Sequence, residues 1–140
     1  MDIRKLAEGI AIAPQLQPGD MAALAKAGYG TIICNRPDGE APDQPGHAEM
    51  TAAAQAAGLE YVYIPISGGE FSEASIAAFV AALHDQPGPA VAYCRSGARS
   101  TTLWALSQAD KLPAEDILNA AANAGIDAMA IAPRLKARKG

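Results

Sequence analysis

The stretch Val91-Ala92-Tyr93-Cys94-Arg95-Ser96-Gly97-Ala98-Arg99-Ser100 joins a short apolar run to a cysteine and a loop with two arginines and a glycine. The segment Thr101–Ala109 has a helical pattern, so the order strand, tight loop, helix is predicted. Such a loop directs consecutive backbone N–H groups and the positive end of the helix dipole at one point. We therefore expect Cys94 to be a nucleophilic thiolate beside an anion-binding site.

Strand and helix patterns alternate along the rest of the chain. Strands are predicted at Ile10–Ala13, Thr31–Asn35, Tyr61–Ile66 and Ala90–Tyr93. Helices are predicted from Pro18 to about Ala27, over His47–Ala57, Glu73–Asp85 and Thr101–Ala109, from Pro113 to Gly125, and from Asp127 toward Arg138. This alternation is typical of an α/β fold, and we expect residues 1–140 to form a single domain with a mostly parallel central sheet flanked by helices.

In such a sheet, ligands collect outside the carboxyl ends of the strands. Three segments should meet at that edge: the Cys94 loop, the loop from Arg36 to Glu40 and the loop from Ser67 to Phe71. The sequence therefore predicts a site there for a small anionic substrate, either a phosphate ester or a sulfur donor.

Composition excludes several classes of protein. Half of the 140 residues are apolar and 19% are charged, as in ordinary globular proteins. The net charge of −4 argues against nucleic-acid binding. No apolar run approaches the ~20 residues needed to cross a bilayer, and the N-terminus lacks a signal-peptide pattern. We expect a cytoplasmic protein of bacterial type; the oligomeric state is left open.

The cysteines and histidines predict neither a disulfide framework nor a metal site. The two cysteines, Cys34 and Cys94, occupy dissimilar contexts, and Cys34 lies in mid-strand among isoleucines, which favours a core role. No spacing links His47 or His84 to further ligands. We expect no metal and no organic cofactor.

Each residue of the Cys94 loop has a functional and a structural interpretation. A buried structural cysteine is the alternative for Cys94, but the arginine-rich loop after it favours catalysis. Arg99 closes the loop, where a planar guanidinium suits oxyanion binding better than a surface ion pair. The position of Arg95 fits contact with substrate and plain exposure to solvent equally well. Gly97 allows a positive φ.

Charged residues in the neighbouring loops are candidates for supporting roles. Arg36 adds positive charge at the active edge or forms a structural ion pair. Asp38, Glu40 and Glu70 are candidate general acids, since a loop carboxyl could reach a leaving oxygen; each is also typical of a solvated loop charge. Without an acid, only esters with good leaving groups should react.

Much of the chain, from about Gly28 to Leu103, resembles the tyrosine and dual-specificity phosphatase superfamily in the order and spacing of its segments. The matching segments are Ala27-Gly28-Tyr29-Gly30-Thr31-Ile32-Ile33, Ala57-Gly58-Leu59-Glu60-Tyr61-Val62-Tyr63-Ile64-Pro65-Ile66, and the cysteine loop after a Gly-Pro turn. More narrowly, Asn35-Arg36-Pro37-Asp38-Gly39-Glu40 with Cys94-Arg95-Ser96-Gly97-Ala98-Arg99-Ser100 looks like the beta-lactamase-hydrolase-like phosphatase family, a small bacterial group.

The resemblance implies a dual-specificity-phosphatase-like fold and phosphomonoester hydrolysis through a phosphocysteine intermediate. It implies that Cys94 is the nucleophile, Arg99 the anion-binding guanidinium, and Ser100 the hydroxyl that steadies the departing thiolate. The backbone N–H groups of the loop would form the cradle. Its candidate substrate-binding residues are Arg95, Ser96, Gly97 and Ala98, with Arg36 from the neighbouring loop.

The sequence departs from the superfamily pattern at three points. Four residues separate Cys94 from Arg99 where five are usual, Tyr93 replaces the usual histidine, and Ser67-Gly68-Gly69 stands where an aspartate acid is expected. The four-residue spacing resembles that of rhodanese sulfurtransferases, whose cysteine carries a persulfide. A rhodanese-like sulfurtransferase is therefore the first alternative, and a catalytically weak module that binds anions or a partner is the second.

Overall fold

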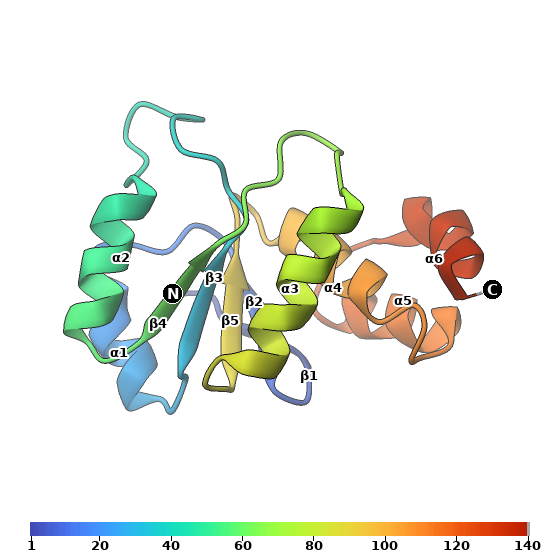
Figure 1. Ribbon diagram of the computed structural model, residues 1–140, viewed down its shortest axis with the longest axis horizontal. Helices are drawn as coiled ribbons and strands as arrows, with labels where there is room; N and C mark the ends of the chain where they lie inside the picture. Colours follow the sequence, from blue (N-terminus) through green and yellow to red (C-terminus); the bar gives the residue numbers. More distant parts are fainter. Residues whose placement is uncertain (140) are drawn as a thin grey trace.

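The computed structural model describes residues 1–139, in which five strands form one sheet of order β1-β2-β5-β3-β4 (Figure 1). The strands are β1 Arg4–Ala7, β2 Ile10–Ala13, β3 Thr31–Cys34, β4 Glu60–Tyr63 and β5 Ala90–Tyr93. β1 pairs with β2 antiparallel, whereas β2, β5, β3 and β4 pair in parallel. The predicted α/β fold with a mostly parallel sheet is confirmed.

Helices cover both faces of the sheet (Figure 1). They are α1 Met21–Lys26, α2 His47–Ala56, α3 Glu73–Asp85, α4 Ala98–Ser107, α5 Ala114–Asn123 and α6 Ala132–Lys139, with 3-10 turns at Pro18–Asp20 and Met129–Ile131. Helices α1 and α2 lie on one face, and α3 to α6 lie on the other (Figure 1). Within residues 1–139, no helix has the length and apolarity needed to span a membrane.

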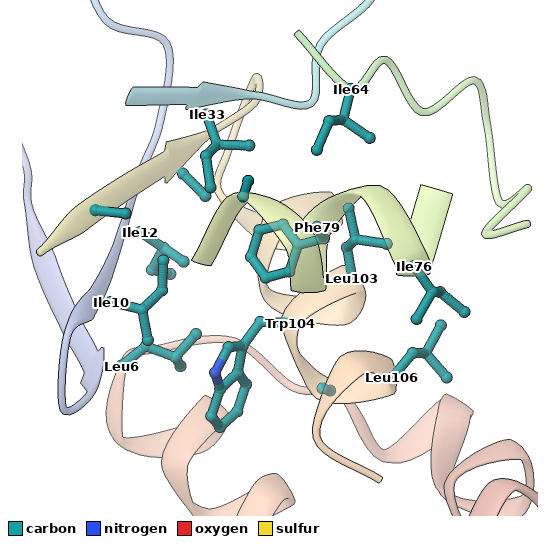
Figure 2. Close-up of a cluster of buried hydrophobic side chains, with 14 of the residues drawn as sticks. Leu6, Ile10, Ile12, Ile33, Ile64, Ile76, Phe79, Leu103, Trp104 and Leu106 are labelled. Carbon is teal, nitrogen blue, oxygen red and sulfur yellow. The ribbon is translucent and has the colours of Figure 1, made fainter. Parts of the chain in front are cut away.

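Two apolar clusters hold the layers together. The larger joins one face of the sheet to α3 and α4, with Phe79 and Trp104 among its largest members (Figure 2). The smaller joins the other face to α1 and α2 through residues such as Met50 and Ile32. Because both faces are covered, all four residues of β2, β3 and β5 are buried.

Several boundaries differ from those predicted. The edge strand β1 was not predicted because its sequence, Arg-Lys-Leu-Ala, buries only Leu6 fully and lacks a clear period. Helix α4 begins at Ala98, three residues before the predicted Thr101, because a left-handed Gly97 starts the helix within the loop. Asp127 does not start a helix: it accepts the N–H of Met129 at 3.0 Å, the N-cap of the 3-10 turn is Ala128, and α6 begins at Ala132.

We expect Phe79→Ala to lower the free energy of unfolding by about 3–5 kcal/mol, because it leaves a cavity between α3 and the sheet. Urea denaturation followed by circular dichroism measures the change. Met129→Ala is the control, since that side chain is largely exposed and should alter stability by less than ~0.5 kcal/mol. Equal effects of the two substitutions would show that Phe79 does not support the core.

Candidate active site at the carboxyl edge of the sheet

The three loops predicted to meet at the active edge form one cleft. It has a volume of about 480 Å³ and is lined by Arg36, Glu40, Ala41, Gly68, Arg95 and Arg99. The strand order explains why these loops lie together. Strand β5 lies between β2 and β3, and β3 lies between β5 and β4. The loops that follow β3, β4 and β5 therefore leave the sheet side by side.

Strand β5 leads directly to Cys94, at the start of the loop that precedes α4. Its side chain is buried, and Sγ accepts a hydrogen bond from the backbone N–H of Gly97 at 3.1 Å. Sγ therefore lies against the loop residue from which α4 begins.

Gly97 is needed for its backbone conformation. Its φ of +93° lies in the left-handed region, which residues with a Cβ rarely adopt. A Cβ here would make ordinary van der Waals contacts, 3.4 Å from Cδ1 of Ile12 and 3.5 Å from the carbonyl oxygen of Ala13. The loop therefore turns against β2, and this turn starts α4 at Ala98, where the N–H of Ala98 donates to Oγ of Ser96 at 3.4 Å.

Arg99 connects the loops through its guanidinium group. Nη1 and Nη2 donate to Oε2 and Oε1 of Glu40 at 2.8 and 2.7 Å, and Nη1 also donates to the carbonyl of Ile66 at 2.8 Å. A guanidinium carries five N–H groups, so these contacts leave Nε–H and one Nη2–H. Those two donors form a fork that matches two oxygens of an anion.

The surroundings of Arg99 hold its guanidinium in the charged form. The pKa of Arg99 is raised above its usual value, first by the hydrogen bond to Glu40, with the charges of Glu40 and Cys94 adding to the effect. Arg99 therefore stays positively charged beside Glu40, in the same loop as Cys94.

Glu40 is held by two arginines and not by Arg99 alone. Nε of Arg36 donates to Oε1 of Glu40 at 3.1 Å, and Nη1 of Arg36 donates to Oε1 of Gln15 at 2.9 Å. The hydrogen bond from Arg99, together with the two positive charges, lowers the pKa of Glu40 from 4.5 to about 2. Such a carboxyl carries no proton at neutral pH, so the prediction of Glu40 as a general acid does not fit its surroundings.

The other two predicted acids do not line the cleft. Asp38 accepts the backbone N–H of His47 at 2.9 Å through Oδ1, and its Oδ2 lies 2.5 Å from Nδ1 of His47. The His47 ring stacks on Tyr63 with centroids 4.0 Å apart, and the N–H of Asp38 donates to the Tyr63 hydroxyl at 3.0 Å. Asp38 therefore fixes the loop to α2 and β4. Glu70 is exposed in the third loop.

Ser100 is fully buried and hydrogen-bonded to an asparagine. Its hydroxyl donates to Oδ1 of Asn35 at 2.8 Å, while Nδ2 of Asn35 donates to the carbonyl of Ile64 at 2.9 Å. Since Nδ2 faces a carbonyl oxygen, Oδ1 must face Ser100, so the serine proton lies on the Asn35 side. Ser100 joins β3 and the end of β4 to α4.

Two residues that support the site were not singled out from the sequence. Asn35 could have been found as a polar residue at the end of an apolar strand. Gln15 carries no comparable signal, yet its side chain binds Arg36 and its N–H donates to the carbonyl of Arg95 at 3.3 Å. The predicted core role of Cys34 matches its burial, which raises the pKa of its thiol.

Comparison with known proteins finds a matching family. Residues 2–111 match the family described as beta-lactamase hydrolase-like protein, phosphatase-like domain. The beta-lactamase hydrolase-like protein of Agrobacterium fabrum strain C58 is 41% identical over 105 residues, which are 75% of this chain and 24% of that protein. This chain therefore spans about a quarter of the length of that curated relative.

Solved structures give the same result for the fold. A candidate phosphatase from Neisseria meningitidis Z2491 superposes with a TM-score of 0.88 at 32% identity, covering 99% of both chains. The kinase-associated phosphatase, solved with its catalytic-site cysteine replaced by serine, gives a TM-score of 0.68 at 15% identity over 96% of this chain and 90% of that one. The second likeness shows the fold alone.

The ion pairs of Glu40 predict how Glu40→Gln affects stability at different pH values. The folded-state pKa is lowered from 4.5 to about 2, so the stabilisation is present above pH 4.5 and is lost as the pH falls toward 2. Urea unfolding of wild type and variant should differ most near neutral pH, and the difference should shrink steadily below about pH 5. Glu70→Gln is the matched control. A difference that does not change with pH would contradict the ion pairing.

Proposed function

Because this chain belongs to the phosphatase-like domain family of beta-lactamase hydrolase-like proteins, we propose that it hydrolyses phosphomonoesters with Cys94 as the nucleophile. One observation carries the proposal: Arg99 keeps two donors beyond its contacts with Glu40 and Ile66, in the same loop as a cysteine whose sulfur accepts a loop N–H group. A phosphoryl group needs both a nucleophile and donors for its equatorial oxygens.

In the first step, Sγ of Cys94 attacks phosphorus. The S–P bond forms, the P–O bond to the leaving group breaks, and the electron pair of that bond goes to the leaving oxygen. The loop N–H groups and the free fork of Arg99 hold the equatorial oxygens as charge builds up on them. Glu40 and the Ile66 carbonyl hold the other donors of Arg99, so the fork is oriented before substrate binds.

In the second step, water attacks phosphorus and the S–P bond breaks. The electron pair returns to sulfur, and phosphate and a proton are released. Rotation of the Ser100 hydroxyl from Asn35 toward sulfur would stabilise the departing thiolate, which is the role that the family resemblance gives to Ser100. Asn35 holds the hydroxyl between turnovers.

We expect the rate of aryl phosphate hydrolysis to fall steeply as the pKa of the leaving phenol rises, because the cleft offers no protonated acid. Initial rates on a series of substituted phenyl phosphates give this dependence. Cys94→Ser should abolish turnover, whereas Cys34→Ser, which alters a buried cysteine in the other core cluster, should retain it. Activity that persists in Cys94→Ser would refute the proposal.

Sulfur transfer is the second candidate, and the four-residue spacing between Cys94 and Arg99 favours it. Compared with the five-residue spacing usual in the phosphatase superfamily, this loop has one N–H donor fewer and encloses a smaller group, such as a persulfide sulfur. With thiosulfate, Sγ of Cys94 would attack the outer sulfur, the S–S bond would break, and sulfite would leave with the electron pair.

Intact-mass spectrometry after incubation with thiosulfate tests the second candidate. A persulfide would appear as a gain of one sulfur atom that requires Cys94 and is removed by cyanide or a thiol. Under the phosphatase proposal we expect the mass to stay unchanged while aryl phosphates are turned over. Binding of phosphate with neither activity would indicate a module that only binds anions.

A further inference from the structure

The cleft constrains which leaving groups the enzyme can expel. Glu40 is the one carboxylate among the described residues that line the cleft, and its ion pairs keep it deprotonated. A leaving oxygen must therefore depart with its negative charge. A phosphate monoester is a good leaving group of this kind, because its second pKa is about 6. A tyrosine phenol is a poorer one, because its pKa is about 10.

Arg95 differs from the other two arginines of the cleft. Arg36 binds Glu40 and Gln15, and Arg99 binds Glu40 and the Ile66 carbonyl. The exposed side chain of Arg95 makes no hydrogen bond or ion pair with the part of the chain that the structure describes, yet it lines the same cleft. Three guanidinium groups against one carboxylate leave two net positive charges there, in a chain of net charge −4.

We propose that the natural substrates are organic diphosphates, with the terminal phosphoryl group in the Cys94 loop and the inner phosphate on Arg95. This rests on the proposed phosphatase function and names its substrate class. Sγ of Cys94 forms a bond to the terminal phosphorus, the P–O–P bridge breaks on that side, and its electron pair leaves on the organic monophosphate. Water then releases inorganic phosphate and a proton, and the thiolate is restored.

Among the residues that the structure describes, the lack of a protonated carboxyl in the cleft lining and the unpaired charge of Arg95 both fit a diphosphate better than a simple ester. A bridging oxygen needs no general acid, because the phosphate that departs is a stable anion. The same phosphate carries the second negative charge that would pair with Arg95. An alkyl phosphate lacks both advantages, and an aryl phosphate with a good leaving group has only the first.

The test compares two substrates with good leaving groups that differ in the second anion, and a third whose leaving group is poor. ADP, 4-nitrophenyl phosphate and glycerol phosphate are assayed by release of inorganic phosphate, with chelator present so that no divalent cation contributes. Wild type should hydrolyse ADP to AMP with a kcat/KM above that for 4-nitrophenyl phosphate, and glycerol phosphate far more slowly than either. Cys94→Ser should be inactive on all three.

Variants then assign the second anion to Arg95. Arg95→Gln should lower kcat/KM for ADP by about tenfold to a hundredfold, the range of one hydrogen bond to a charged group, and should lower kcat/KM for 4-nitrophenyl phosphate by a smaller factor. Arg95→Lys should restore part of the ADP activity. Lys111→Gln removes one positive charge from a different cleft beside α3, so it should leave kcat/KM for both substrates unchanged.

The outcomes separate this inference from the proposed function. If wild type hydrolyses none of the three substrates, both the phosphatase proposal and the diphosphate assignment are overturned. Hydrolysis of 4-nitrophenyl phosphate without ADP, or an equal loss for both substrates in Arg95→Gln, would overturn the diphosphate assignment and leave the phosphatase proposal standing. A selective loss of ADP activity in Arg95→Gln, partly rescued in Arg95→Lys, would support it.

Discussion

The guanidinium group of Arg99 is the contact on which the site depends, because it ties together three loops that are far apart in sequence. It belongs to the first turn of α4, binds both carboxylate oxygens of Glu40 after β3, and binds the Ile66 carbonyl after β4. Arginine suits this position because its five donors lie in one plane and serve several acceptors at fixed angles. A lysine could not hold two loops and still present a fork to an anion.

The sheet order explains why this one side chain can reach both loops. β5 carries the cysteine and is flanked by β2 and β3, so the loop after it emerges between the loops of its neighbours. Further contacts brace the same edge: Gln15 binds Arg36 and the Arg95 carbonyl, and Asn35 links Ser100 to Ile64. The fold therefore holds the Arg99 guanidinium in place before any substrate is present, as the proposed electrostatic catalysis requires.

The sequence predicted those parts of the site that depend on local chain geometry. Cys94, Gly97 and Arg99 belong to one strand–loop–helix unit, so their relation follows from a few adjacent residues and the alternating strand and helix patterns. The parts missed depend on tertiary contacts. Glu40 was read as a possible acid because its two arginine partners come from separate segments, and Gln15 had no local signal. β1 was missed because an edge strand that is half exposed lacks a strong apolar period.

Attack of Cys94 on phosphorus would leave a covalent intermediate, which can be trapped. The protein is mixed with 4-nitrophenyl phosphate, quenched in acid within the first turnover, digested, and examined by mass spectrometry. We predict a phosphoryl group on the peptide that carries Cys94, absent from Cys94→Ser and from the peptide that carries Cys34. Rapid turnover with no phosphoryl group on Cys94, or a phosphoryl group on another residue, would contradict the mechanism.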